Sequence, residues 1–164
     1  MAGSSGGCTF TEPNRESIGL VAGFGVEGEV HAGAMVKHRF RMRQDPSQPN
    51  PRQVHLIHDE LFDEVAAAGF EGAAGHLGEH VTIRGVDLLR LPVGARLHLR
   101  DEAVVEVTGL RDPCTRISDF REGLLKRVAG RDSDGTVRLR SGIMSVVLIG
   151  GVVRPGDPVR GELP

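Results

Sequence analysis

The sequence predicts a mainly β protein, and three observations lead to this fold class. Apolar and polar residues alternate with a period of two in several short stretches, which is typical of strands with one buried face. The 164-residue chain contains 23 glycines, which suits tight turns between short strands. Helical spacing of apolar residues is confined to a few short segments. We therefore expect a strand-rich domain with two or three short helices packed on it.

The strands are assigned from this alternation and from the glycines and prolines that separate them. The hairpin connection Asp101-Glu102 joins two of them. In the strand that begins at Gly142, the residues expected to be buried are Met144, Val146, Val147 and Leu148. The predicted strands are Ser17 to Phe24, Arg52 to His58, Glu79 to Arg84, Ala95 to Arg100, Ala103 to Thr108, Val137 to Arg140, Gly142 to Ile149 and a short one from Val159.

Two helices are predicted. The first covers Asp59 to Ala68, where Asp59 is the expected N-cap or first-turn acid and Gly69 the stop. The second begins a few residues after Cys114, where Ile117 and the apolar residues that follow recur at helical spacing. The positive end of its dipole would lie near the thiol and favour a thiolate or an anionic ligand.

Length and composition narrow the classes of function. At 17.6 kDa the chain is expected to form one domain over residues 17–164, after a disordered tail over residues 1–16. A net charge of -2 and the absence of Trp and Tyr argue against a nucleic-acid binder. No apolar stretch is long enough to span a bilayer, and no signal peptide is recognisable, so we expect a cytoplasmic protein without a membrane partner.

One of the two cysteines, Cys114, is the candidate working group. Gly109 permits a bend after the preceding strand, and Pro113 fixes the backbone just before the thiol. The guanidinium groups of Arg111 and Arg116 would favour the thiolate, which attacks electrophiles and binds soft metals. An inert, half-buried cysteine is the alternative that the residues alone leave open.

Several motifs resemble the signature of MOSC domains, the family named after the C-terminal domain of molybdenum cofactor sulfurase. The resemblance runs in order from about Ser17 to the C-terminus. In this chain His80 stands where the family usually has asparagine, and Gly28-Glu29 where it usually has Gly-Asp. The segments that carry it are Gly25 to Gly33, Arg52 to Ile57, Gly78-Glu79-His80-Val81-Thr82, Gly85-Val86-Asp87-Leu88, Leu91-Pro92-Val93-Gly94, Val107 to Cys114 and Gly150 to Asp157.

The resemblance implies a fold around a β-barrel with the cysteine in a pocket, and an association with molybdenum cofactor binding and sulfur transfer. Relatives with this domain ligate molybdenum through the cysteine that matches Cys114, and some reduce N-hydroxylated compounds. Larger relatives fuse a pyridoxal phosphate-dependent desulfurase to the domain, for which this chain has no room. The resemblance therefore favours a working thiol over an inert one.

The predicted site has Cys114 as catalytic residue and metal ligand. Arg111 and Arg116 would tune the thiol or bind anionic groups, and Arg52 and Lys37 are candidate phosphate contacts. His31 and His80 would act as proton donors in the pocket, since the unperturbed pKa of histidine lies near neutrality. The residues expected to bind molybdenum cofactor are Arg111, Arg116, Arg52, Lys37, His31, Glu79, His80, Thr82 and Thr108.

Three functions remain open at this point. The first is an oxidoreductase acting on a small molecule at a cysteine-ligated molybdenum. The second is a sulfur carrier that holds a persulfide on Cys114 for a partner protein, and the third is a binding module without chemistry. Zinc hydrolysis is disfavoured because the seven histidines form no HExxH motif and no paired CxxC occurs.

Overall fold

The computed structural model describes residues 2–3, 14–28, 50–70, 77–111, 129–131, 133–135 and 137–164. Within these ranges the fold is mainly β, as predicted, with one α-helix and one short 3₁₀ helix. The helix predicted after Cys114 lies outside the described residues. The described helices are α2 (Glu60–Ala67) and η1 (Leu88–Arg90).

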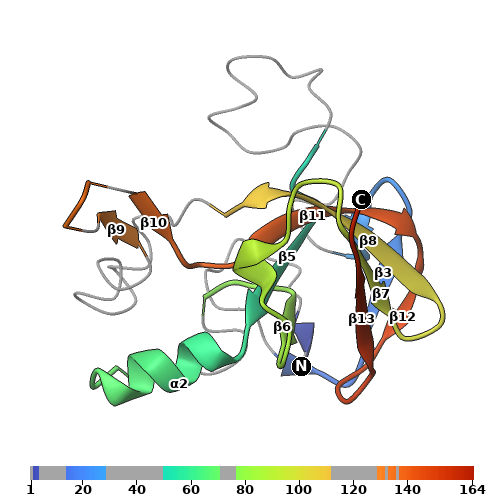
Figure 1. Cartoon of the computed structure of the whole chain (residues 1–164). Helices are drawn as coiled ribbons and strands as arrows, with labels where there is room; N and C mark the ends of the chain where they lie inside the picture. The colour runs from blue at the N-terminus through green and yellow to red at the C-terminus, as the bar shows by residue number, and fades with distance from the viewer. Residues whose placement is uncertain are drawn as a thin grey trace.

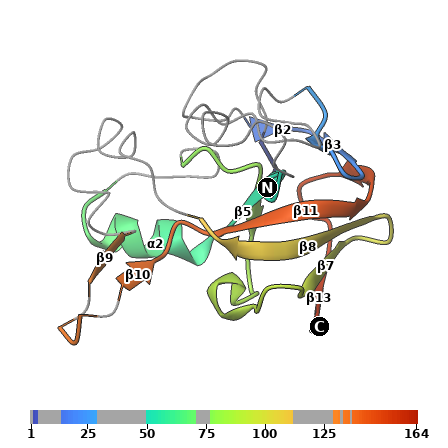
Figure 2. The same cartoon turned by 90° about the horizontal axis from the view of Figure 1, so that it is seen from above.

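The strands form one large sheet and two small ones (Figures 1 and 2). The large sheet has the order β13-β7-β8-β11-β5-β6-β1-β2, and its six strands from β13 to β6 curl into a half-barrel. The small sheets have the orders β12-β3-β4 and β10-β9. The strands are β1 (Ala2–Gly3), β2 (Asn14–Arg15), β3 (Ile18–Val21), β4 (Gly25–Val26), β5 (Val54–His58), β6 (Val81–Ile83), β7 (Arg96–Leu99), β8 (Ala103–Leu110), β9 (Ala129–Arg131), β10 (Val137–Leu139), β11 (Ile143–Ile149), β12 (Gly151–Val153) and β13 (Val159–Glu162).

The pair β5–β6 is parallel, whereas every other pairing recorded between the described strands is antiparallel. A parallel pair needs a crossover connection, and α2 lies within it. All five residues of β5 are buried, and the strand contributes to two cores: Val54 and Leu56 to the main one, and Ile57 to the one that contains α2. β5 is thus covered on both faces, unlike the half-buried strands that simple alternation predicts.

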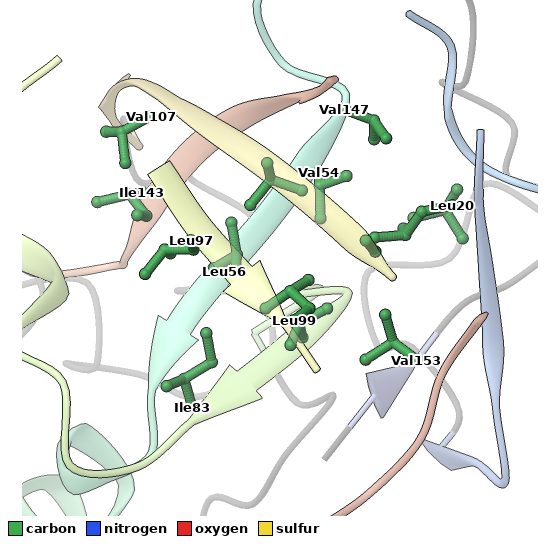
Figure 3. Packing of buried hydrophobic residues seen from close by; sticks show 14 of the residues in the cluster. Leu20, Val54, Leu56, Ile83, Leu97, Leu99, Val107, Ile143, Val147 and Val153 are labelled. Atoms are coloured by element: carbon green, nitrogen blue, oxygen red, sulfur yellow. The ribbon is translucent and has the colours of Figure 1, made fainter. Parts of the chain in front are cut away.

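The main core fills the inside of the half-barrel. Alternate residues of the strands point inward, and Figure 3 shows their side chains converging from several elements. Leu56, Leu97, Leu99, Val105 and Ile143 are fully excluded from solvent. Burial of such side chains stabilises the fold by about 1.5–3 kcal/mol each. This core fixes the strand ends on which the candidate site is built.

A second, smaller core holds α2 beside the sheet. Leu61, Phe62 and Val65 of the helix pack with Ile57 and Leu77. In Figures 1 and 2 the helix lies on the side of the sheet away from β3. The helix ends before Gly69, whose φ of +89° fits the predicted stop.

Asp59 is the N-cap residue of α2, as predicted. Its side chain nevertheless makes no capping hydrogen bond with the helix. Its carboxylate instead accepts a hydrogen bond from Nε of Arg84 at 2.7 Å, and Asp63 accepts another from the same guanidinium at 3.0 Å. The acidic residues therefore tie the helix to the chain just after β6.

One further expectation at the strand level needs correction. Leu148 was expected to be buried, but 38% of its surface is exposed, because β11 has left the core at that point. The predicted hairpin between β7 and β8 is confirmed, since Leu99 pairs with Ala103. In place of a glycine, Arg100 takes the left-handed conformation there, with a φ of 60°.

Two short strands, β1 and β2, fall within the segment predicted to be a tail. Ala2 is aligned with Arg15 and with Val81 of β6. The division into a tail and a domain stays a prediction. Among the helices that the structure describes, none has the length and apolar character needed to cross a membrane.

Candidate functional site

Six of the ten predicted site residues are described, and they lie in three segments that the sheet brings together. Thr108 and Arg111 lie at the end of β8, Arg52 precedes β5, and the remaining three belong to the loop before β6 and to β6 itself. The pairings β8–β11, β11–β5 and β5–β6 place these segments side by side. The predicted residues outside the described ranges are Cys114, Arg116, Lys37 and His31.

The backbone of Arg111 is clamped to the start of β11 by two hydrogen bonds. Its N–H donates to the carbonyl oxygen of Gly142 at 2.9 Å, and its own carbonyl accepts from the hydroxyl of Ser141 at 3.0 Å. Ser141 and Gly142 are both buried. The chain is therefore fixed at Arg111, three residues before Cys114 in the sequence.

The clamp requires a glycine at position 142, because the site has no space for a side chain and because the backbone has a positive φ. Its φ is +89°, and an added Cβ would lie 2.1 Å from the carbonyl oxygen of Leu56 and 3.0 Å from Nε2 of His55. No side chain fits in that gap. The sequence pattern marks Gly142 only as the start of a strand, because the close approach of a neighbouring strand leaves no signal in the local sequence.

His55 is a site residue that the sequence analysis did not single out. Its Nε2 lies 2.6 Å from the carbonyl oxygen of Ser141, and because a carbonyl only accepts, Nε2 must carry the proton. Burial lowers the pKa of His55 well below its usual range, and the positive charge of Arg111 lowers it further. His55 is therefore a neutral donor that supports the Arg111 clamp.

His80 is locked against β5 by a reciprocal pair of hydrogen bonds. The backbone N–H of His55 donates to Nδ1 of His80 at 3.0 Å, and the backbone N–H of His80 donates to the carbonyl of His55 at 3.0 Å. Because Nδ1 accepts, the neutral ring carries its proton on Nε2. In this arrangement His80 is a hydrogen-bond donor through Nε2 and not a charged acid.

The carboxylate of Glu79 is turned into the protein. Only 1% of the residue is exposed, and its two oxygens accept hydrogen bonds from the backbone N–H of Leu77 at 3.1 Å and from the hydroxyl of Thr82 at 3.0 Å. Thr82 is itself 7% exposed. Glu79 and Thr82 thus brace the loop before β6, and a role of either one toward a ligand stays a prediction.

Thr108 lies at an irregularity of β8 that bends the strand end. Val107 is aligned with Ser145 and Gly109 with Met144, so Thr108 is the extra residue between them. Such a bulge twists a strand and redirects its side chains. The Thr108 hydroxyl donates to the carbonyl oxygen of Pro51, which links the end of β8 to the segment that carries Arg52.

The electrostatics of this end of the sheet favour an anion. Arg111 and Arg52 are partly buried cations, and the hydrogen bond from Thr108 to Pro51 links the segments that carry them. His55 is neutral because burial and the charge of Arg111 lower its pKa, and His80 accepts a hydrogen bond at Nδ1. The buried carboxylate of Glu79, in the loop before β6, accepts hydrogen bonds from Leu77 and Thr82. In the part of the chain that the structure describes, no three His, Cys, Asp or Glu side chains are grouped so that they could hold a metal ion.

A separate open cleft of about 370 Å³ lies where the two sides of the half-barrel approach each other. It is lined by Thr82, Ile83 and Arg84 on one side and by residues 156–159 on the other. Of the six described site residues, Thr82 is part of its lining. Neither the Arg111 clamp nor His55 is part of the lining, so the cleft meets the candidate site only at Thr82.

Comparison with known proteins identifies the fold and the family model that the chain matches. The model described as MOSC domain matches residues 29–160. The structure of the YuaD protein from Bacillus subtilis superposes with a TM-score of 0.77 at 20% identity, over 96% of this chain and 91% of that one. YiiM from Escherichia coli gives a TM-score of 0.63 at 15% identity, over 99% of this chain and 68% of that one. The comparison with curated proteins gives no match.

Proposed function

Because the chain belongs to the MOSC domain family, we propose that it binds molybdenum cofactor at the end of β8. The observation that carries this proposal is the clamp of Ser141 and Gly142 on Arg111. It provides a rigid, positively charged support three residues before Cys114 in the sequence. A working thiol needs such a support, whereas an inert cysteine does not.

The described residues fit an anionic, pterin-containing group. Guanidinium groups are well suited to bind a phosphate, and Arg111 and Arg52 are the two candidates among the described residues. His80 would add a neutral donor at Nε2 without adding charge. Cys114 would supply the thiolate ligand, with Arg116 and Lys37 as further cationic contacts.

The cofactor would supply two-electron redox chemistry, which in this chain would serve the reduction of a small substrate such as an N-hydroxylated compound. The contribution of the protein is to hold the ligand and to set its surroundings. His55 keeps Ser141 in place through its Nε2–H, and Ser141 in turn holds the backbone of Arg111. Holding these groups before the ligand arrives lowers the cost of ordering them on binding.

The test is the cofactor content of protein made in a host that synthesises molybdenum cofactor. Molybdenum is measured by elemental mass spectrometry and pterin by fluorescence of its oxidised form, for the unaltered chain, Cys114→Ser and the matched control Cys8→Ser. We expect the unaltered chain and Cys8→Ser to carry both components, and Cys114→Ser to lose at least about 90% of the molybdenum. An unaltered chain without pterin would overturn the proposal, and equal molybdenum in Cys114→Ser would overturn the ligand role.

The same preparations distinguish the sulfur-carrier alternative. After incubation with a cysteine desulfurase and cysteine, a persulfide would add the mass of one sulfur atom to the intact protein. This addition would disappear on reduction and would be absent from Cys114→Ser. A labile sulfur on a chain that binds no pterin would assign the chain to sulfur transfer.

A further inference from the structure

One ring nitrogen of His55 is buried without a hydrogen-bond partner. Nε2 donates to the carbonyl oxygen of Ser141 at 2.6 Å, which leaves Nδ1 of the neutral ring with a lone pair. Only 2% of the residue is exposed, and within the described ranges Nδ1 has no hydrogen-bond partner. Buried polar atoms of folded proteins are nearly always paired. This nitrogen is therefore a candidate proton acceptor.

The groups around the ring suit a second proton. Burial and the charge of Arg111 lower the pKa of His55, whereas the backbone carbonyls of Ser141 and Gly78 raise it. A proton on Nδ1 would turn that atom into a donor for the carbonyl of Gly78, and the bond from Nε2 to Ser141 would stay in place. The imidazolium form thus satisfies both nitrogens.

Two effects hold the ring in its neutral form. Burial disfavours any charge, and the guanidinium of Arg111 repels a second cation. His80 is the other titratable group beside the ring, and its Nδ1 accepts the backbone N–H of His55 at 3.0 Å. Glu79, in the same loop, uses both carboxylate oxygens in hydrogen bonds of its own. The repulsion from Arg111 is the effect that a bound anion would cancel.

We propose that His55 takes up a proton when an anion binds at Arg111, so that the anion and the proton bind together. This inference rests on the proposed function for the anion site at Arg111. A negative charge beside the guanidinium offsets its repulsion of an imidazolium, whichever anion supplies that charge. Burial still opposes the charge, so loss of the anion returns the ring to its neutral form.

A chain of hydrogen bonds makes His55 a positioning residue for Arg111. Ser141 accepts from Nε2 of His55 through its carbonyl, and its hydroxyl donates to the carbonyl of Arg111 at 3.0 Å. Ser141 is fully buried, so water does not compete for these bonds. A hydrogen bond from a charged donor is stronger than one from a neutral donor. Protonation of His55 therefore strengthens the support of Arg111 while the anion is bound.

The coupling gives anion binding a definite pH dependence. The pKa of His55 is higher with the anion bound than without it, so binding takes up protons at pH values between the two. Anion affinity therefore rises as the pH falls through the pKa of the bound form. It levels off once the pH is below the pKa of the free form.

The test is calorimetric titration of the full chain, made in a host without molybdenum cofactor, at constant ionic strength. Sodium sulfate is the probe, because its charge does not change at the pH values used. In His55→Gln the amide can still donate to Ser141 but does not titrate. From about pH 8 to pH 5.5 the sulfate dissociation constant of the unaltered chain should fall at least about fivefold more than that of His55→Gln.

The matched control is His58→Gln. His58 is also a buried histidine whose pKa is lowered by burial, and it lies outside the candidate site. This control should keep the pH dependence of the unaltered chain. Equal pH profiles of sulfate binding for the unaltered chain and His55→Gln would overturn the proposal, as would loss of the pH dependence in His58→Gln.

Nuclear magnetic resonance of the unaltered chain covers the case in which His55→Gln does not fold. The nitrogen chemical shifts of the ring report the protonation of His55, which sulfate should move to higher pH. In Arg111→Gln, His55 should already protonate at higher pH, and sulfate should have no further effect. Sulfate that shifts the Arg111 side-chain signal but leaves the His55 titration unchanged would overturn the coupling and leave the anion site of the proposed function standing. Sulfate that does not reach Arg111 would overturn the coupling, whereas the cofactor content decides the proposed function.

Discussion

The imidazole of His55 is neutral in the folded chain because it is buried and lies near the charge of Arg111. In the unfolded chain it titrates near pH 6.5. Unfolded molecules therefore take up a proton first as the pH falls. The stability that this difference contributes is complete above about pH 6.5 and is lost as the pH falls below it.

Replacement of His55 by glutamine tests this linkage. The amide nitrogen of Gln can still donate to the carbonyl of Ser141, but Gln does not titrate. Between pH 7 and 5.5, the unaltered chain should lose about 1 kcal/mol more unfolding free energy than His55→Gln. Urea titrations at several pH values measure the difference. The pKa of His58 is also lowered, mainly by burial, but His58 is present in both proteins, so its contribution cancels. Parallel pH profiles would contradict the assignment.

Gly142→Ala tests the clamp directly. The new Cβ would lie 2.1 Å from the carbonyl oxygen of Leu56, so strands β5 and β11 must separate there. We expect a loss of more than about 3 kcal/mol of unfolding free energy. Gly156→Ala is the matched control, because Gly156 has nearly the same φ, +88°, and nothing within 4 Å of an added Cβ. This control should lower the unfolding free energy by only about 1–2 kcal/mol, because it adds the strain of the left-handed conformation and no contact. Equal losses would show that the contact with Leu56 does not constrain the backbone.

At this scale the sequence predicts residue types better than it predicts partners. Arg111 could be named because it precedes Cys114 by three positions, and Thr108 lies in the segment Val107 to Cys114 that carries the family resemblance. The roles of His55 and Ser141 could not be predicted, because their contact spans 86 positions in the sequence. Only the pairing of β5 with β11 brings them together.

Helix α2 depends on a core of its own, separate from the core of the half-barrel. Leu61 is 1% exposed and packs only within this smaller core. Leu61→Ala should lower the unfolding free energy of α2 and its small core by about 2–5 kcal/mol. We expect it to speed amide hydrogen exchange in residues 60–67 and to leave β8 and β11 protected. Exchange measured by mass spectrometry tests this, with Leu97→Ala in the main core as a control that should speed exchange throughout. Uniform loss of protection in Leu61→Ala would mean that the two cores unfold as one unit.

The period-two pattern placed most strands within one or two residues of their observed bounds. It did not reveal β12, because Gly151 interrupts the apolar run and leaves three residues for the strand. It also assigned Leu148 to the core, since an apolar run does not show where a strand leaves the sheet.

The whole molecule has two ends with different character. Around the clamp there are cations, neutral histidines and polar hydrogen bonds, whereas several large apolar side chains are exposed at the far end of β11 and on β12. β11 joins the two ends and makes extensive pairings with both β8 and β5. The sequence at the two ends of β11 also differs: Ser141-Gly142 of the clamp precedes the strand, and Gly150-Gly151 follows it.

The barrel architecture was expected from the resemblance to MOSC domains, and the fold comparisons confirm it. The order of the strands could not be obtained from periodicity. Neighbours in the sheet such as β11 and β5, or β13 and β7, are far apart in the sequence. Pairings of this kind are selected by the packing of the complete core and not by local preference.

The clamp on Arg111 has a consequence for how the protein is made. Ser141 and Gly142, which hold Arg111, follow it by about thirty positions in the sequence. Cys114 therefore leaves the ribosome well before these two residues are synthesised and exposed. A growing chain thus emerges with its thiol while the backbone at Arg111 still lacks these two bonds. Insertion of a ligand that needs the anchored form must wait until translation has passed β11.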